Sequence, residues 1–93
     1  MLAQCKRNAW KRRHRFEVIA CILREASDWA TKTRLVYRTN LNFHILGKYL
    51  DFLISRGLIE RRQMNTLTFY RTTRKGKLWL SCYSRVLDLL ENG

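Results

Sequence analysis

The chain has 93 residues, 46% of them hydrophobic, which is enough for one domain with a modest core, so a second domain is not expected. Lysine and arginine total 19 against 7 acidic residues, and the formal net charge is +12. This surplus indicates a polyanionic partner, nucleic acid first, although membrane surfaces and acidic proteins attract basic domains by the same Coulomb interaction.

A basic N-terminal arm, residues 1–12, is the first predicted segment. Its lysines and arginines have no acidic neighbour, and because like charges repel we expect the arm to be flexible. Over residues 15–26 the apolar side chains recur at helical spacing, while Glu17, Arg24 and Glu25 fall outside that stripe. The pattern predicts a first helix that packs by one face.

A second and a third helix are predicted next, separated by a tight turn. Thr31 can cap the second helix by accepting a hydrogen bond from a free backbone amide. In the turn, Asn40 tolerates a left-handed backbone, Leu41 can fill the angle between the helices, and Asn42 can cap the third helix. The two helices are expected over residues 32–38 and 43–56.

Gly57 can adopt the left-handed backbone that ends the third helix, and Leu58 can then fold back on it, as in a Schellman ending. Residues 58–62 and 67–72 are strand-like and are joined by a link of hairpin length. Two helices around a tight turn, followed by a hairpin, are the pattern of a winged helix-turn-helix. The expected fold class is mainly α with a small β-hairpin (α+β), with the winged domain over residues 13–72.

The C-terminal segment, residues 73–93, is predicted to be a helix with two adjacent apolar stripes. A helix that covers only its own small domain needs one stripe, so this width leaves surface to bury against a second copy of the chain. The spacing of the stripes is that of a coiled-coil seam. We expect a homodimer through this helix, with an interface formed by Trp79, Cys82, Tyr83, Val86, Leu89 and Leu90.

Four runs of sequence carry a family resemblance: RRHRFEVIACILREA, KTRLVYRTNLN, YLDFLISRGLIE and YRTTRKG. They resemble the archaeal ten-kilodalton winged-helix DNA-binding proteins of Sulfolobus chromatin, the Sso-ten-a type, from about Arg13 to the end of the chain. The resemblance implies homodimers joined by an antiparallel coiled coil of the C-terminal helices, which bind duplex DNA as chromatin or regulatory proteins. The chain differs from the family at Asp28-Trp29, where a glycine is usual, and in its rather short final helix.

The third helix is predicted to enter the DNA major groove, as the second helix of a helix-turn-helix does. Asn42, His44 and Lys48 are expected to reach base edges, and Gly47 is expected to allow close approach to the DNA backbone. Asp51 lies on the same face and is expected to pair with Lys48. The full predicted DNA-binding set is Lys32, Arg34, Arg38, Asn42, His44, Lys48, Ser55, Arg61, Arg62 and Arg71, with Lys11, Arg12 and Arg13 of the arm as further contacts.

The predicted function is that of a dimeric protein that binds double-stranded DNA, either as a transcriptional regulator or as a chromatin-associated protein. Its expected location is the cytoplasm, in association with the nucleoid. Two other functions remain open on the sequence: a winged-helix module that docks an acidic protein partner, and RNA binding. RNA binding would require stacking aromatic residues on an exposed strand face.

Enzyme activity is not expected, because the sequence has no glycine-rich phosphate cradle, no GxSxG motif and no closely spaced carboxylate pair. No metal, cofactor or small-molecule ligand is expected, since only His14 is available to join His44 in a metal site. Cys5, Cys21 and Cys82 form no CxxC pair and are expected to be reduced thiols. No apolar run approaches the roughly 20 residues that span a bilayer, so no membrane partner is expected, and no signal peptide is apparent.

Overall fold

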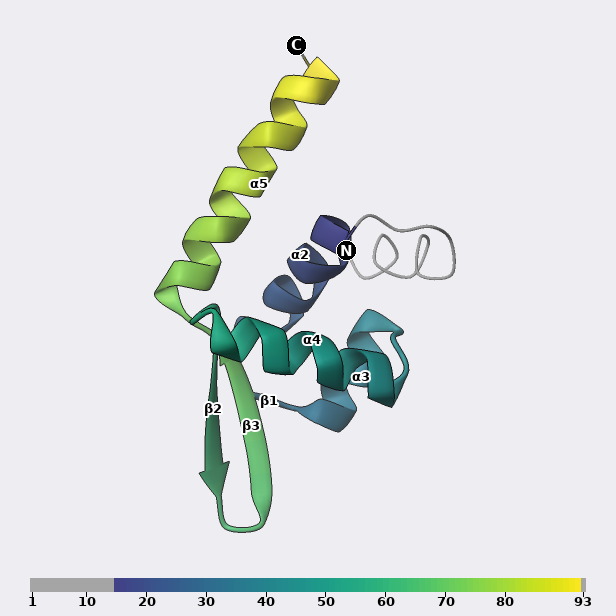
Figure 1. Cartoon of the computed structure of the whole chain (residues 1–93), viewed down its shortest axis with the longest axis vertical. Coiled ribbons are helices and arrows are strands. Elements are labelled where there is room, and N and C mark those ends of the chain that lie inside the picture. Colours follow the sequence, from purple (N-terminus) through teal and green to yellow (C-terminus); the bar gives the residue numbers. More distant parts are fainter. Residues whose placement is uncertain (1–14, 93) are drawn as a thin grey trace.

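Four helices and a three-stranded sheet form the part of the chain that the computed structural model describes, residues 15–92 (Figure 1). The predicted α+β winged helix-turn-helix is confirmed. The predicted arm contacts Lys11, Arg12 and Arg13 lie outside the described residues. In chain order the elements are α2 (Arg15–Glu25), β1 (Ala30–Thr31), α3 (Lys32–Thr39), α4 (Phe43–Ser55), β2 (Ile59–Met64), β3 (Leu67–Thr72) and α5 (Arg74–Asn92).

Side-chain caps fix the first turns of α3 and α4. The Thr31 hydroxyl accepts a hydrogen bond from the Arg34 amide at 3.3 Å, and the Asn42 side chain accepts one from the Ile45 amide at 2.7 Å. Both bonds satisfy amides that a helix start leaves without partners. Asn40 has a φ of 61° and closes α3. All three roles were predicted from the sequence and are confirmed.

The end of α4 is a Schellman motif. Gly57 has a φ of +77°, the Leu58 amide donates to the Leu53 carbonyl at 2.9 Å, and the Gly57 amide donates to the Ile54 carbonyl at 3.0 Å. These two bonds are the pair that defines the motif. The predicted helix stop is therefore confirmed, and it sends the chain directly into β2.

The sheet has one strand more than the sequence predicted. β1 pairs with β3, with Ala30 opposite Tyr70, and the strand order is β1-β3-β2. β2 also extends to Met64, so the hairpin turn is shorter than expected and contains Asn65 at a φ of 56°. A strand of two residues is too short to show an alternating pattern in the sequence. β1 forms because its backbone pairs with β3, which is distant in sequence.

The core lies between α2, α3, α4 and the inner face of the sheet. The prediction that α2 packs by one face is wrong, because residues 18–23 of this helix are all buried. α2 contacts α3, α5 and β3. The other buried side chains of the core include Leu35, Leu46, Leu50, Leu53, Ile59 and Tyr70.

The first turn of α5 is bonded to the end of α4. The Thr73 amide donates to the Leu58 carbonyl at 3.0 Å and its hydroxyl donates to the Gly57 carbonyl at 2.6 Å. The Lys75 ammonium donates to the Arg56 carbonyl at 2.7 Å. Beyond this joint, α5 projects from the body on the side opposite the tip of the β2-β3 hairpin (Figure 1).

The two cysteines among the described residues, Cys21 and Cys82, differ in state. Cys21 is buried in α2 and is disulfide-bonded, so the expectation of three reduced thiols is wrong at this position. Cys82 is an exposed thiol on α5. Within residues 15–92, no helix has the length and apolar character needed to cross a bilayer.

Candidate nucleic-acid interface

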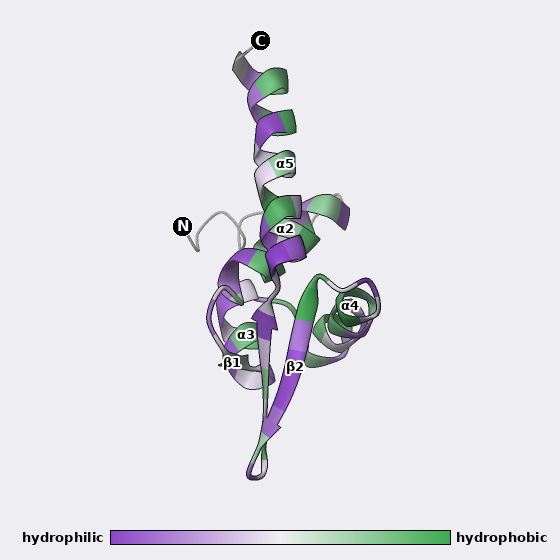
Figure 2. Ribbon diagram, turned by 90° about the vertical axis from the view of Figure 1, so that its left-hand side faces the viewer, coloured by the Kyte–Doolittle hydropathy of each residue, from purple (hydrophilic) through white to green (hydrophobic). Residues whose placement is uncertain are grey.

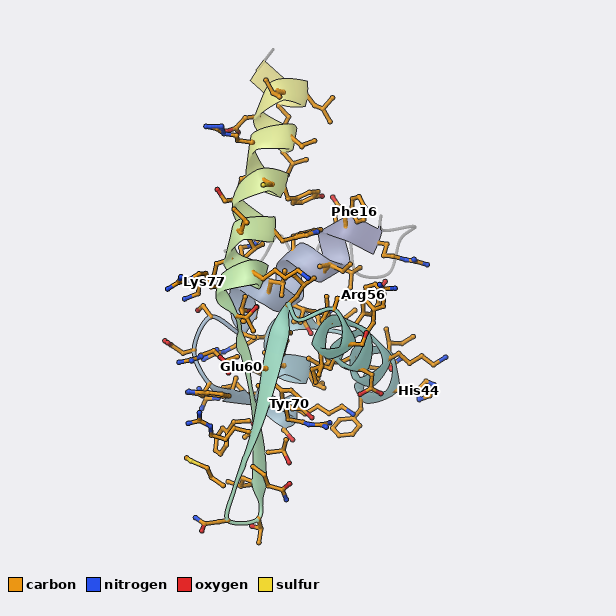
Figure 3. All side chains as sticks on the ribbon, turned by 60° about the vertical axis from the view of Figure 1, so that its left-hand side comes forward. Phe16, His44, Arg56, Glu60, Tyr70 and Lys77 are labelled. Atoms are coloured by element: carbon orange, nitrogen blue, oxygen red, sulfur yellow. The ribbon has the colours of Figure 1, made fainter. Side chains whose placement is uncertain are left out.

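The exposed side of α4 faces away from the sheet and carries polar residues at helical spacing. His44, Lys48, Asp51 and Ser55 are exposed, whereas Leu46, Leu50 and Leu53 bury the opposite side of the helix in the core. Figure 3 shows His44 on the outer side of α4, away from the hairpin. A helix fits the major groove because its diameter of about 10–12 Å matches the groove width of roughly 12 Å.

Lys32 stands beside the first turns of α4, although it belongs to α3. Its ammonium lies 3.9 Å from the centre of the Phe43 ring, a cation–π contact. A Cβ atom at Gly47 would lie 2.8 Å from the same ammonium nitrogen. The space left by the missing side chain of Gly47 therefore holds the end of Lys32, and the predicted role of Gly47, close approach to the DNA backbone, stays a prediction.

The other predicted residues of α4 have different surroundings. Among the described residues the single ion pair joins Arg71 to Glu60, so the predicted Lys48–Asp51 pair is not formed. The Ser55 hydroxyl donates to the Phe52 carbonyl at 2.6 Å and lies at the end of α4 opposite Asn42. The Asn42 side-chain oxygen is used in the helix cap, which leaves its amide group for other contacts.

The predicted arginines of the hairpin lie on two different faces of the sheet. Arg61 is opposite the buried Tyr70, on the inner face that packs toward α4. Arg62 is opposite Phe69, and because side chains alternate along a strand it points to the outer face. Arg71, opposite Glu60, also points outward. Figure 3 shows Glu60 and His44 on opposite sides of the sheet.

Trp29 is the centre of a cluster on this outer face that the sequence analysis did not predict. The guanidinium carbons of Arg62 and Arg71 lie 4.9 Å and 4.6 Å from its rings. Arg71 also donates two hydrogen bonds to one oxygen of Glu60, at 3.2 Å and 3.0 Å. The sequence signal that could have indicated this cluster was Trp29 itself, an aromatic residue at the bend where the family that the chain resembles usually has a glycine.

The two predicted arginines of α3 adjoin this cluster. Arg34 and Arg38 line a hollow of about 450 Å³ together with Trp29 and Phe69. One nitrogen of Arg38 donates to the Glu25 carbonyl at the end of α2, at 3.2 Å. The structure therefore divides the predicted DNA-binding set into an α4 face, with Lys32, Asn42, His44, Lys48, Ser55 and Arg61, and an outer sheet face, with Arg34, Arg38, Arg62 and Arg71.

The predicted interface residues of α5 also fall into two groups. Trp79 packs against the core, stacks on Tyr83 at a centroid distance of 5.2 Å, and meets Phe16 of α2 edge-on at 5.8 Å. Farther along the helix, Leu89 and Leu90 are 74% and 76% exposed. Figure 2 shows hydrophobic residues continuing along α5 after it has left the body. The remaining predicted residues, Cys82 and Val86, are exposed as well.

Comparisons with known proteins agree with this arrangement. The sequence model of the winged helix-turn-helix family matches residues 12–91. An uncharacterised protein of Methanocaldococcus jannaschii is 40% identical over 86 residues, which cover 91% of this chain and 81% of that protein. The crystal structure of Sso10a-2, a DNA-binding protein from Sulfolobus solfataricus, superposes with a TM-score of 0.78 at 30% identity, covering 86% of this chain and 84% of that one.

A winged helix-turn-helix domain from Mycobacterium bovis shares the fold with a TM-score of 0.68 at 20% identity, covering 99% of this chain and 84% of that one. The resemblance to the Sulfolobus ten-kilodalton proteins is confirmed by the Sso10a-2 match, which extends over most of both chains. The chain therefore belongs to the winged helix-turn-helix family.

Proposed function

We propose that this protein binds double-stranded DNA, with α4 in the major groove. The observation that carries the proposal is the α4 face, on which the ammonium of Lys32 is held beside the first turns of a capped helix that also presents His44 and Lys48. The amides at the start of α4 give this end a partial positive charge, which favours phosphate. Arg61 lies on the sheet face that packs toward the same helix.

The family relation supports the same conclusion. Sso10a-2 is a DNA-binding protein, and this chain shares its fold over most of its length at 30% identity. The net charge of +12 adds a general attraction for a polyanion. Within the footprint, Asn42, His44 and Lys48 would face base edges, whereas Lys32 and Arg61 would contact phosphates.

We further propose that two copies pair through α5 in an antiparallel coiled coil. The apolar residues of its outer half, Val86, Leu89 and Leu90, are exposed in the single chain, and burying them would remove a large apolar surface from water. Trp79 and Tyr83 are engaged with Phe16 in the same chain, so the pairing surface would lie chiefly beyond them.

The test of duplex binding is a fluorescence-anisotropy titration of a short random-sequence duplex at several salt concentrations. If each protomer neutralises about two phosphates, through Lys32 and Arg61, the dimer should give a log-log salt slope near −4, from roughly 0.9 per phosphate. Arg61→Gln removes one of these cations per protomer and should make the slope shallower by about 2 in the dimer.

Arg85→Gln is the matched control for the duplex titration. It removes the same charge from an exposed position on α5, away from the α4 face, and the slope should not change. Equal effects of the two variants would contradict the α4 footprint. Competition with genomic fragments then separates the two roles, because a regulator should prefer its site by about 10³-fold or more, whereas a chromatin protein should bind all duplexes alike.

A further inference from the structure

The outer face of the sheet bears a groove that the duplex footprint does not use. Its central hollow, of about 450 Å³, is lined by Trp29, Phe69, Arg34 and Arg38. A second hollow, of about 630 Å³, shares Arg34 and Arg38 with it and continues along α3, and a small third one, of about 90 Å³, shares Trp29 and Phe69 and continues to Arg62. We call these adjoining hollows the outer groove.

The charge of the outer groove is positive and its cations are held in place. Arg34, Arg38, Arg62 and Arg71 lie at or beside it, against the two carboxylates of Asp28 and Glu60. The ring of Trp29 supports two of the guanidinium groups, and the Glu25 carbonyl holds a third. Because these contacts already restrict the arginine side chains, a bound anion would cost less ordering entropy.

The apolar part of the groove consists of flat groups. Phe69 is half-buried and pairs with Thr31 of the neighbouring strand β1. The guanidinium planes over Trp29 present a second flat surface. Unpaired bases stack on aromatic rings and on arginine planes, while paired bases inside a duplex have no free faces for such contacts. The central hollow is also within the volume range of sites for small organic molecules.

We propose that the outer groove binds single-stranded nucleic acid, with a base stacked at Phe69 and the backbone following Arg34 and Arg62. The groove lies on the sheet face turned away from α4, so a duplex on α4 leaves it accessible. An acidic peptide would use the arginines but not the flat rings, whereas a single strand uses both. This proposal does not rest on duplex binding, which involves the other face.

The experiment is an anisotropy titration of the full chain with a labelled single strand of oligothymidylate or of oligouridylate, alone and in the presence of saturating unlabelled duplex. The wild-type protein should bind the strand in both conditions. Phe69→Leu keeps an apolar side chain but removes the ring, and it should weaken single-strand binding about ten-fold, the loss expected for one stacked base. Comparison of the two strands shows whether DNA or RNA is preferred.

A second variant does not depend on a partly buried position. Arg34 and Arg62 are exposed, so the double change Arg34→Gln and Arg62→Gln should fold normally, and it should make the single-strand salt slope shallower by about 1.4, from roughly 0.7 per phosphate. The single-strand salt slope should fall more than the duplex salt slope in this variant, because the proposed duplex footprint lies on the α4 face. Lys48→Gln, on the α4 face, is the matched control and should leave single-strand binding unchanged.

Three results would overturn the proposal. The first is no binding of the single strand at low salt, and the second is complete displacement of the strand by duplex. The third is a loss of single-strand binding in Lys48→Gln that equals the loss in the outer-groove variants. The first and third of these results can occur whether or not the protein binds duplex DNA, so failure of this proposal is distinguishable from failure of the proposed function.

Discussion

Two glycines inside helices, Gly47 and Gly76, have opposite surroundings. Alanine is usually favoured over glycine within a helix by about 0.5–1 kcal/mol. At Gly47 the obstacle to a Cβ atom is the far end of the flexible Lys32 side chain. At Gly76 the obstacle is backbone, because a Cβ atom would collide with the Leu58 carbonyl oxygen. The same substitution should therefore have opposite effects on stability.

Gly47→Ala should raise the free energy of unfolding by about 0.5–1 kcal/mol, because the alanine favours the helix and Lys32 can move away. The displaced ammonium should leave the Phe43 ring, and duplex affinity should fall several-fold. Urea denaturation and anisotropy on the same preparation measure both effects. Tighter duplex binding would show that the position of the Lys32 ammonium over the Phe43 ring does not contribute to DNA binding.

Gly76→Ala should lower the free energy of unfolding by about 1–3 kcal/mol, the usual cost of forcing extra atoms into a packed site. The new methyl group would meet the Leu58 carbonyl and the Thr72 methyl group, and the joint between α5 and the end of α4 would have to shift. Thermal and urea unfolding measure the change. A stability equal to that of the wild type would mean that this joint is not tightly packed.

The residues of the candidate site were predictable only where a single helix decides their position. Exposure of His44 and Lys48 follows from the apolar period of α4, which the sequence displays directly. The position of the Lys32 ammonium beside Gly47 was not predicted, because Lys32 belongs to another helix. Trp29 was not predicted because its contacts come from arginines on two strands much later in the chain.

At the scale of elements, helix ends were predicted to within one residue because their causes are local. The caps of α3 and α4 and the Schellman ending all involve residues within five positions of one another. β1 and the full length of β2 were missed because pairing with β3 determines them. The packing of α2 on several sides was missed for the same reason, since neighbours distant in sequence bury it.

The packing of α5 on α2 gives a prediction at alkaline pH. Burial raises the pKa of Tyr83 above its ordinary value of 10.0, the charge of Glu17 raises it further, and Arg24 acts in the opposite direction. As the pH rises, the Tyr83 hydroxyl loses its proton in the unfolded chain before it does so in the folded chain. The contribution of Tyr83 to the free energy of unfolding is therefore fully present below about pH 10 and is lost as the pH rises through the raised pKa. Stability should therefore decline in that window.

Tyr83→Phe should reduce this alkaline decline in the free energy of unfolding, which denaturation across a pH series measures. Glu17→Gln removes the second cause of the shift, and the pKa of Tyr83 should move toward its ordinary value. The chain has four tyrosines, so the tyrosinate absorbance is compared with that of Tyr83→Phe to isolate this pKa. An unchanged pKa in Glu17→Gln would mean that the α2–α5 contact is looser in solution.

At the scale of the whole molecule, the proposed dimer depends on the outer half of α5. The double change Leu89→Lys and Leu90→Lys places four cations per pair on the proposed apolar surface, and it should convert the dimer to monomers. Sedimentation equilibrium measures the mass. These residues lie beyond the cluster of Trp79 and Tyr83, so the fold should be retained, and a variant that keeps twice the mass of the chain would exclude this interface.

The bonded joint between the end of α4 and the first turn of α5 has a geometric consequence. It fixes the direction of one helix with respect to the other, through Thr73 and Lys75. In a pair joined through α5, this helix acts as a rigid spacer that sets the separation and phase of two DNA contacts. One added heptad would lengthen it by about 10 Å, roughly a third of a DNA turn, and would turn the second contact toward a different side of the duplex.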